Sequence, residues 1–303
     1  MEDGVNGQQS AFRYNTTGRW FKGNTHIHST VSDGGKTFRE LADMYAAAGY
    51  DFLFRADHWA ASDVEQDGGK YPLLWLDGIE LDGPDSTGAQ YHVVCLGTVR
   101  NIVPEMGLVA AMESARKQGA MIVLAHPFWT GNSLDDALRH GFDAVEIYNH
   151  VCRWLNSKSD SLVHWDAMLS KNPNVLGLSV DDAHIQPSHP GWNGGWIGVN
   201  ATACSRDAIL NAIRRGNYYS SCGPAFNTIE LSGDTVSITT SPVQFVRLVG
   251  PTCNGERAGT FDGPAITTAT FQLHPEWQHA YIEIEDAAGR RAWTNNLFAN
   301  QRG

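Results

Sequence analysis

Two histidines separated by one residue, His26 and His28, are the first candidates for chemistry in this sequence. If residues 25–29 are extended, both imidazoles project from the same face, because side chains alternate along a strand. Asp33 follows in a Ser-Asp-Gly turn, where its carboxylate would fold back over the strand end. These three side chains would make half of a metal site. An isolated His-x-His is about as often a pair of polar residues on a half-exposed strand.

Further imidazoles and carboxylates follow later apolar segments of the chain. In α/β barrels the carboxyl ends of the strands meet at one rim, where catalytic groups gather, so we expect these side chains to converge with His26 and His28. A ligand set without thiolates suits Zn²⁺, Mn²⁺ or Fe²⁺. The set exceeds what one ion needs, and Glu80 is the natural bridge between two. The additional candidates are His58, Glu80, His92, His126, Asp182 and His184.

The elements that must position these residues alternate between strands and helices. Short apolar runs predict strands at 52–54, 73–81, 90–99, 121–125, 144–148, 175–180 and 218–221. Periodic patterns predict helices at 37–48, 105–118, 134–140, 162–169 and 207–214. This rhythm is typical of an α/β fold with a parallel sheet and crossover helices, most economically a barrel.

After Pro224 the pattern changes to short alternating segments separated by Gly, Pro and Asp turns. Such segments predict a small antiparallel, sandwich-like β domain. We therefore expect a loose polar arm over residues 1–18, an α/β barrel over 19–224 and a β domain over 225–303.

Composition excludes several classes of protein. The 303 residues are 42% hydrophobic and 18% charged, as in globular proteins, and the net charge is −11 with no Lys/Arg cluster, so we expect no nucleic-acid partner. The five scattered cysteines form no Cys-x-x-Cys, which indicates reduced thiols and favours the cytoplasm. No basic-then-apolar leader and no membrane-spanning run is visible. The oligomeric state is not indicated.

Five segments together resemble the PHP (polymerase and histidinol phosphatase-like) superfamily: residues 25–34, 56–58, 78–80, 125–127 and 182–184. The resemblance covers roughly residues 20–222 and implies a distorted (β/α)7 barrel with two or three metals on its C-terminal rim. It implies a first metal held by His26, His28, Glu80 and Asp182, a second held by Glu80, His92 and His126, and a third held by Asp33, His58 and His184. Residues 218–224 and 286–295 resemble the carbaryl-hydrolase-like metallohydrolase branch.

Two metals a few ångströms apart activate a shared water and hold the attacked oxygen, which suits phosphate esters. We therefore expect a metal-dependent phosphoesterase in which a bridging hydroxide attacks phosphorus. The same centre would also serve carbamates, esters or amides. Six aromatic side chains near the rim would line a pocket for a small substrate with an aromatic group, or simply plug the barrel: Trp59, Phe128, Trp129, Tyr148, Trp192 and Trp196. A non-catalytic metal-binding module is the third reading.

Four residues outside the ligand set are candidates for catalysis. Asp57 would orient the ligand His58 from behind. Arg55 would contact phosphate or else join a buried ion pair. His150 and His189 fall in loops on the rim side, where either would protonate the leaving group or remain a solvated loop histidine.

Overall fold

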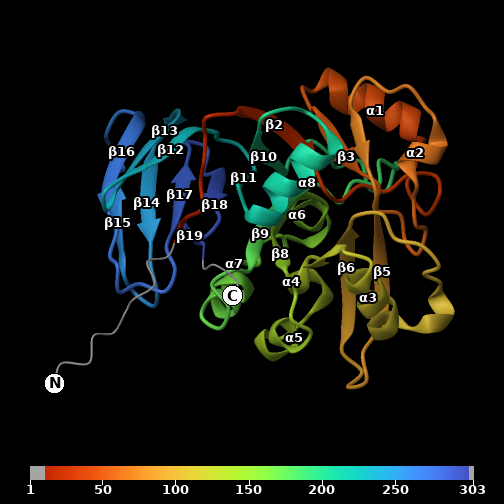
Figure 1. The fold of residues 1–303 in the computed structure, drawn as a ribbon. Coiled ribbons are helices and arrows are strands. Elements are labelled where there is room, and N and C mark those ends of the chain that lie inside the picture. Colours follow the sequence, from red (N-terminus) through yellow and green to blue (C-terminus); the bar gives the residue numbers. More distant parts are fainter. Residues whose placement is uncertain (1–10, 300–303) are drawn as a thin grey trace.

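The structure is a computed structural model that describes residues 11–299. Figure 1 shows two parts side by side, an α/β part formed by residues 19–221 and an all-β part formed by residues 226–294. The α/β fold and the antiparallel character of the C-terminal part agree with the sequence patterns.

One nine-stranded sheet runs through both parts, in the order β15-β14-β17-β18-β11-β10-β2-β3-β4. The neighbours β2, β3 and β4 are parallel, and all other pairs are antiparallel. The predicted domain boundary near 224 thus falls inside a continuous sheet, since β11 pairs with β18. The strands are β2 (Arg19–Asn24), β3 (Phe52–Phe54), β4 (Leu74–Leu76), β10 (Trp196–Ala201), β11 (Tyr218–Ser221), β14 (Phe245–Val249), β15 (Gly255–Ala258), β17 (Tyr281–Glu285) and β18 (Arg291–Thr294).

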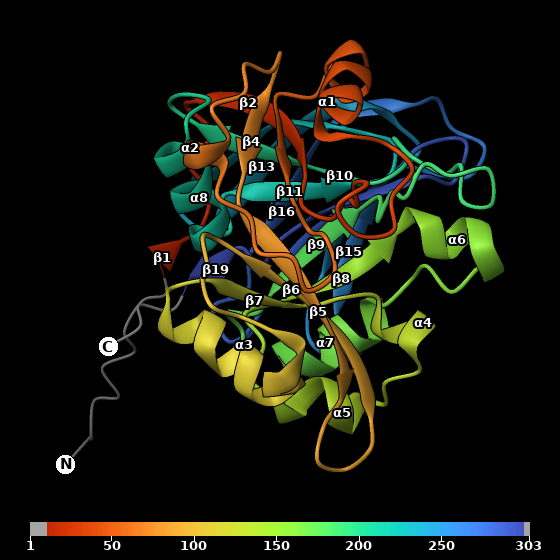
Figure 2. The same cartoon turned by 90° about the vertical axis from the view of Figure 1, so that its right-hand side faces the viewer.

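A second sheet of five strands completes the α/β part, in chain order from β5 to β9. β6 is antiparallel to both neighbours, whereas β7, β8 and β9 are parallel. Figure 2 shows the long β5–β6 hairpin, against which α3 packs. The strands are β5 (Gly78–Pro84), β6 (Gln90–Leu96), β7 (Met121–Leu124), β8 (Ala144–Asn149) and β9 (Leu176–Val180).

The strand pairs of residues 11–299 do not form one closed sheet. Among the described residues, backbone pairing between the two sheets is limited to two isolated parallel bridges, Ile27 with Ala183 and His58 with Glu80. The predicted strand 73–81 is two strands in different sheets, and the break falls at Asp77, which accepts hydrogen bonds from Val64 N at 2.8 Å and Thr98 Oγ1 at 2.6 Å. The expected (β/α)7 barrel therefore holds only at the coarser level of an α/β fold.

The helices cover the sheets and set the spacing between strand ends. In α1, Thr37 and Glu40 form a reciprocal capping box, and Leu41, Ala42 and Tyr45 turn one apolar face to the core. The α-helices are α1 (Phe38–Ala47), α2 (Val64–Asp67), α3 (Leu108–Lys117), α4 (Pro127–Thr130), α5 (Leu134–Arg139), α6 (His150–Asn156), α7 (Leu162–Leu169) and α8 (Arg206–Arg215); η1 (Pro104–Met106) is a 3₁₀ turn. No helix among the described residues has the length and apolar character needed to cross a membrane.

Two smaller sheets finish the fold. The three-stranded sheet β12 (Phe226–Ser232), β13 (Thr235–Val243) and β16 (Ile266–Gln272) shares one apolar core with strands of the large sheet, as in a sandwich. β1 (Ala11–Phe12) pairs with β19 (Phe298–Ala299). Residues 1–10 of the predicted loose arm 1–18 lie outside the described residues. Its described part is not loose, since Tyr14 is buried and its hydroxyl donates to Tyr218 O at 2.7 Å.

Candidate metal centre

The nine predicted ligands gather at one end of the α/β part. His26 and His28 follow β2, His58 follows β3, and His126 follows β7. Asp182 and His184 follow β9, Glu80 and His92 lie within the β5–β6 hairpin, and Asp33 lies in the loop before α1. Parallel strands thus deliver most of the set by their carboxyl ends, as the sequence predicted.

The loop that carries Asp33 is held by a buried carboxylate. Asp57 accepts hydrogen bonds from Ser29 N at 2.8 Å, Ser29 Oγ at 2.8 Å and Ser32 Oγ at 2.8 Å. Gly34 is required there, because a Cβ would lie 2.2 Å from the carbonyl oxygen of His28. The prediction that Asp57 orients His58 is wrong, since Asp57 is occupied by the serine loop.

His58 is oriented instead by Asp82, whose Oδ1 lies 3.1 Å from its Nδ1. Asp82 is two residues beyond Glu80 on β5, so both carboxylates point to the same face of the strand.

At the middle of the centre two imidazoles and two carboxylates converge. His26 Nε2 and His28 Nε2 are 3.0 Å apart, and each lies 3.1 Å from Glu80 Oε2. Asp182 Oδ1 lies 3.1 Å from His28 Nε2 and 3.3 Å from His26 Nε2. All four side chains are buried.

The remaining ligands extend the centre on two sides. Glu80 Oε1 lies 2.8 Å from His92 Nδ1 and 3.6 Å from His126 Nε2. On the other side, Asp33 Oδ2 lies 3.2 Å from His184 Nε2. Four groups of described residues could hold a metal ion: His28, Asp33, His58 and His184; His26, His28 and Asp182; His26, Glu80 and His126; and His58, Glu80 and His92.

These groups match the allocation implied by the family resemblance only in part. Asp33 groups with His58 and His184, as expected, but also with His28. His92 groups with His58 rather than with His126. That the nine residues bind metal stays a prediction, which the geometry makes possible.

The donor atoms fit divalent cations. His26 Nδ1 lies 2.6 Å from Glu146 Oε1, and a carboxylate accepts, so Nδ1 carries the proton and Nε2 of the neutral ring has a free lone pair. That lone pair faces a second imidazole nitrogen and two carboxylate oxygens. Such a cluster of acceptors needs a cation, either a metal or protons.

In the absence of metal, protons bound to the imidazoles supply the positive charge. Burial alone would lower the pKa of His26, but Asp182, Glu80 and Glu146 together outweigh it and raise the pKa well above 6.5. Burial likewise opposes a rise in the pKa of His28, which hydrogen bonds to Asp182 and Glu80 nevertheless produce. Conversely, burial would raise the pKa of Glu80, but His26 and its neighbouring imidazoles hold it well below its usual value.

Strained backbone marks the same strand ends. His126 has φ +26°, Asp182 has φ +55° and Trp59, next to His58, has φ +52°. Side chains other than glycine rarely adopt this left-handed region, and such strain gathers at functional sites.

Two residues behind the ligands were not singled out from the sequence. Glu146, buried on β8, bonds His26 and also accepts from His126 N at 3.0 Å. Asn149 Nδ2 donates to Glu146 Oε2 at 3.0 Å and to Asp182 Oδ2 at 3.2 Å. A lone carboxylate in the otherwise apolar strand 144–148 was the signal that could have found Glu146.

A cavity of about 210 Å³ opens beside the centre. Seven of the nine ligands line it, together with His189, Trp129 of α4, and Val151, Cys152 and Leu155 of α6. Of the six aromatic residues expected to surround a pocket, only Trp129 is in this lining; Trp192 packs on Tyr45 instead, and Lys22 lies over Trp196.

The other catalytic candidates separate. His189 lines the cavity, with its ring edge-on to His184 at 5.4 Å between centroids. His150 begins α6 outside this lining and packs against Gly194, where a Cβ would lie 2.1 Å from the ring. Burial lowers the pKa of His150 despite the opposing charge of Asp181.

Arg55 is a structural residue. It is buried, pairs with Asp67, and its guanidinium lies over Phe38 at 3.9 Å and Trp75 at 5.5 Å. Of the two alternatives the structure shows an ion pair, although its partner Asp67 is exposed. Arg55 is not among the residues that line the cavity.

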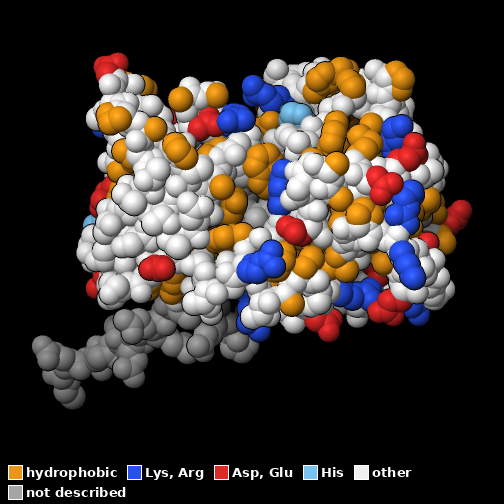
Figure 3. Space-filling view, turned by 90° about the horizontal axis from the view of Figure 1, so that it is seen from above, with side chains coloured by type: hydrophobic (Ala, Val, Ile, Leu, Met, Phe, Trp, Pro, Cys, Tyr) orange, Lys and Arg blue, Asp and Glu red, His pale blue; other side chains and the backbone are white. Residues whose placement is uncertain are grey.

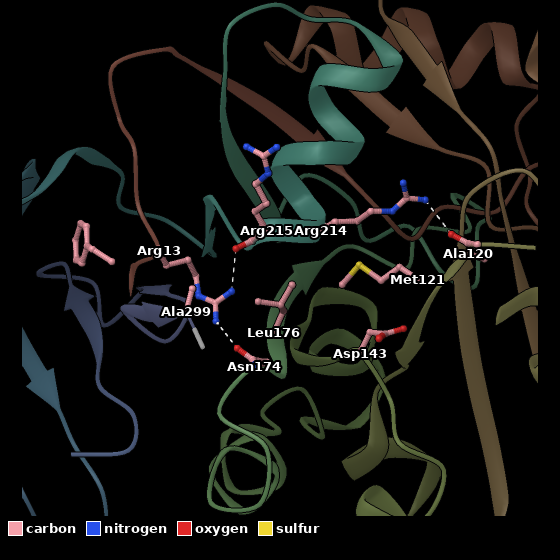
Figure 4. Close-up of a pocket in the computed structure, with 11 residues that line it drawn as sticks. Arg13, Ala120, Met121, Asp143, Asn174, Leu176, Arg214, Arg215 and Ala299 are labelled. Atoms are coloured by element: carbon pink, nitrogen blue, oxygen red, sulfur yellow. Dashed lines mark hydrogen bonds between the residues drawn. The ribbon is translucent and has the colours of Figure 1, made fainter. Parts of the chain in front are cut away.

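A larger cavity, of about 550 Å³, lies at the opposite ends of the same strands, beside the first residues of β7 and β9 (Figure 4). Two of its three arginines donate to backbone carbonyls: Arg13 Nη1 to Arg215 O at 2.8 Å, and Arg214 Nη2 to Gly119 O at 2.9 Å. This cavity holds none of the clustered histidines.

No family model and no curated protein matches the sequence. Among solved structures, the chain is similar to a two-domain protein from Bacteroides vulgatus ATCC 8482 that contains a predicted PHP-like metal-dependent phosphoesterase. The two are 16% identical with a TM-score of 0.55, covering 96% of this chain and 98% of that one.

Two weaker likenesses are to a candidate metal-dependent phosphoesterase from Bifidobacterium adolescentis ATCC 15703 (12% identity, 64% of this chain and 96% of that one, TM-score 0.40) and an amidohydrolase from Chromobacterium violaceum (22% identity, 56% and 57%, TM-score 0.24). The first likeness shows a shared fold and confirms the PHP-like resemblance at that level. The resemblance to the carbaryl-hydrolase-like branch stays a prediction.

Proposed function

We propose that this chain is a metal-dependent hydrolase that cleaves a small phosphate ester at a centre of two or three divalent metals. The position of Glu80 carries the proposal. Its Oε2 lies 3.1 Å from His26 Nε2 and 3.3 Å from His58 Nε2, while its Oε1 faces His92. A buried carboxylate between separate imidazole groups is suited to bridging two cations.

The residues have distinct parts in this proposal. When bound, divalent metals such as Zn²⁺, Mn²⁺ or Fe²⁺ lower the pKa of a water molecule and polarise the ester. Glu146 and Asn149 fix His26 and Asp182, and Asp57 fixes the loop of Asp33. Of the two predicted proton donors we assign His189 to the leaving oxygen, because it is the one that lines the cavity.

Hydrolysis of a carbamate, ester or amide is the second candidate. One observation favours it: among the described residues that line the cavity there is no Lys or Arg to pair with the charge of a phosphate. Phosphate would then depend on the metals alone for neutralisation, whereas an uncharged carbonyl ester would not.

The test begins with protein purified without chelators, analysed for bound metal and loaded in turn with zinc, manganese and iron. We expect phenyl phosphate to be hydrolysed, and the activity to disappear with chelation and in His26→Ala. Cleavage of a phenyl carbamate with no phosphate hydrolysis under any metal would select the second candidate. If no metal is bound and added metal does not shift the melting temperature, the hypothesis of a non-catalytic module would be favoured.

We also propose a small-molecule substrate and a reducing, cytoplasmic setting. All five cysteines are unpaired, which supports the second point. The face in Figure 3 carries interspersed positive and negative side chains on the α/β part and few charges over the β strands. No continuous basic patch, the usual footprint of nucleic-acid binding, is visible among the described residues on this face.

A further inference from the structure

The cavity beside the metal centre has two unlike walls. One is made of imidazoles and carboxylates. The other, here called the α6 wall, consists of Trp129, Val151, Cys152 and Leu155. Figure 2 shows the two short helices that supply it, α4 and α6, close together on one side of the molecule.

The α6 wall is fixed to the centre by hydrogen bonds. Asn149, the residue before α6, accepts from Cys152 N at 3.0 Å while its Nδ2 donates to Asp182 Oδ2 at 3.2 Å. Val151 N donates to Asp181 O at 3.0 Å. One asparagine thus contacts both the first turn of α6 and a predicted ligand, and so connects the wall to the centre.

The wall runs from the ligands to the mouth of the cavity. Trp129 stands edge-on to His126 at 5.2 Å and to His92 at 5.9 Å between ring centroids. Val151 is buried, and Leu155 is 37% exposed. The apolar side of a group bound here would be removed from water, while the group remained next to the reacting centre.

We propose that the α6 wall binds the apolar part of the ester, a single aromatic ring or a branched alkyl group of similar size, which departs as the phenol or alcohol. The inference rests on the proposed function. Hydrolysis adds water across the ester bond: the hydroxyl oxygen goes to phosphorus, the P–O bond breaks, and the departing oxygen takes the proton. An engineered cavity of about 150 Å³ holds benzene, so about 210 Å³ admits one ring but not a fused pair beside the phosphate.

The test measures binding without turnover. Metal-loaded protein is titrated by calorimetry with phenylphosphonate and with methylphosphonate, which carry the same charged group and cannot be hydrolysed at an ester bond. We expect phenylphosphonate to bind at least about 10-fold tighter, and Leu155→Ala to reduce that ratio several-fold. Leu138→Ala is the matched control: Leu138 is also 37% exposed, but it lies on α5 outside the cavity and should leave the ratio unchanged.

Equal affinities for the two phosphonates, or a ratio unaffected by Leu155→Ala, would overturn the inference. A parallel assay with phenyl phosphate and methyl phosphate separates this failure from that of the proposed function. If phenylphosphonate binds more tightly but neither ester is hydrolysed, the proposed phosphoesterase activity is wrong and the proposed role of the α6 wall stands. If both esters are hydrolysed but the two phosphonates bind equally, the phosphoesterase activity stands and the proposed role of the α6 wall is wrong.

Discussion

Glu146 Oε1 lies 2.6 Å from Nδ1 of His26, and both side chains are buried at the middle of the centre. The carboxylate fixes the ring with Nδ1 protonated and turns Nε2 towards Glu80 and Asp182. Carboxylates placed behind metal-binding imidazoles in this way hold the ring and increase its basicity.

Replacing Glu146 with glutamine should therefore weaken metal binding without removing any ligand. We expect Glu146→Gln to lower the affinity for zinc by about 10- to 100-fold, measured by competition with a chromogenic chelator. Glu113→Gln, an exposed change on α3, is the control. An unchanged zinc affinity in Glu146→Gln would show that Glu146 has no part in positioning His26.

Asp33 and His26 should differ in how much metal they control. Asp33 belongs to one of the four groups and is 52% exposed, whereas His26 is buried and belongs to two. Asp33→Ala should cost about one metal equivalent and keep the metal near His26, while His26→Ala should lose more metal and abolish hydrolysis. Elemental analysis after dialysis gives the metal content of each variant. Equal metal loss in the two variants would contradict this division.

The sequence predicts that the nine residues converge because five of them, His26, His58, His126, Asp182 and His184, closely follow strands. His26, His58 and His126 end apolar runs whose direction is fixed by the α/β alternation, so their side chains had to meet. Helix 162–169 and strand 218–221 have the predicted bounds for the same reason, a strong local pattern. The predicted ligand set therefore reflects topology more than any single motif.

The rest depends on contacts between distant segments. The sequence suggests His58, the next residue, as the partner of Asp57, yet its partners Ser29 and Ser32 lie 28 and 25 residues earlier. Strand β10 was missed because its six residues stand between loops, and only pairing with β2 and β11 holds them extended. The sequence also does not show that the barrel stays open. The apolar run 73–81 looks like one strand, but Asp77 divides it into β4 and β5, which belong to different sheets.

Metal should reverse the pH dependence of stability. Without metal, burial lowers the pKa values of His26, His28 and His184, but the neighbouring carboxylates outweigh burial. These pKa values are therefore raised above 6.5. Below pH 6.5 this stabilisation is present in full. Above it the folded chain binds more protons than the unfolded one, so stability falls as pH rises through the raised pKa values.

We therefore expect chelator-treated protein to be less stable to urea at pH 8 than at pH 6. Zinc-loaded protein should show the opposite slope, because the metal binds only deprotonated imidazoles and its binding releases protons. The lowered pKa of Glu80 places its own titration below this range. Stability of the metal-free protein that rises from pH 6 to pH 8 would contradict the proton-for-metal exchange.

Arg55 should matter for stability and not for chemistry. Its guanidinium is buried between Phe38 and Trp75 and pairs with Asp67, and it lies outside the cavity lining. Arg55→Leu should lower the free energy of unfolding by about 1–3 kcal/mol, because an ion pair and two cation–π contacts are lost from a buried position.

Urea titration gives the loss of stability in Arg55→Leu, and kcat/KM normalised to folded protein gives the catalytic effect. Arg100→Leu is the matched control: Arg100 is 65% exposed and pairs with Asp63 at 2.6 Å, so its loss should cost less than about 1 kcal/mol. A large fall in kcat/KM in Arg55→Leu, at unchanged stability, would restore Arg55 as a substrate contact. The buried position of its guanidinium under α1 predicts the reverse, a less stable protein whose folded fraction hydrolyses its substrate at the normal rate.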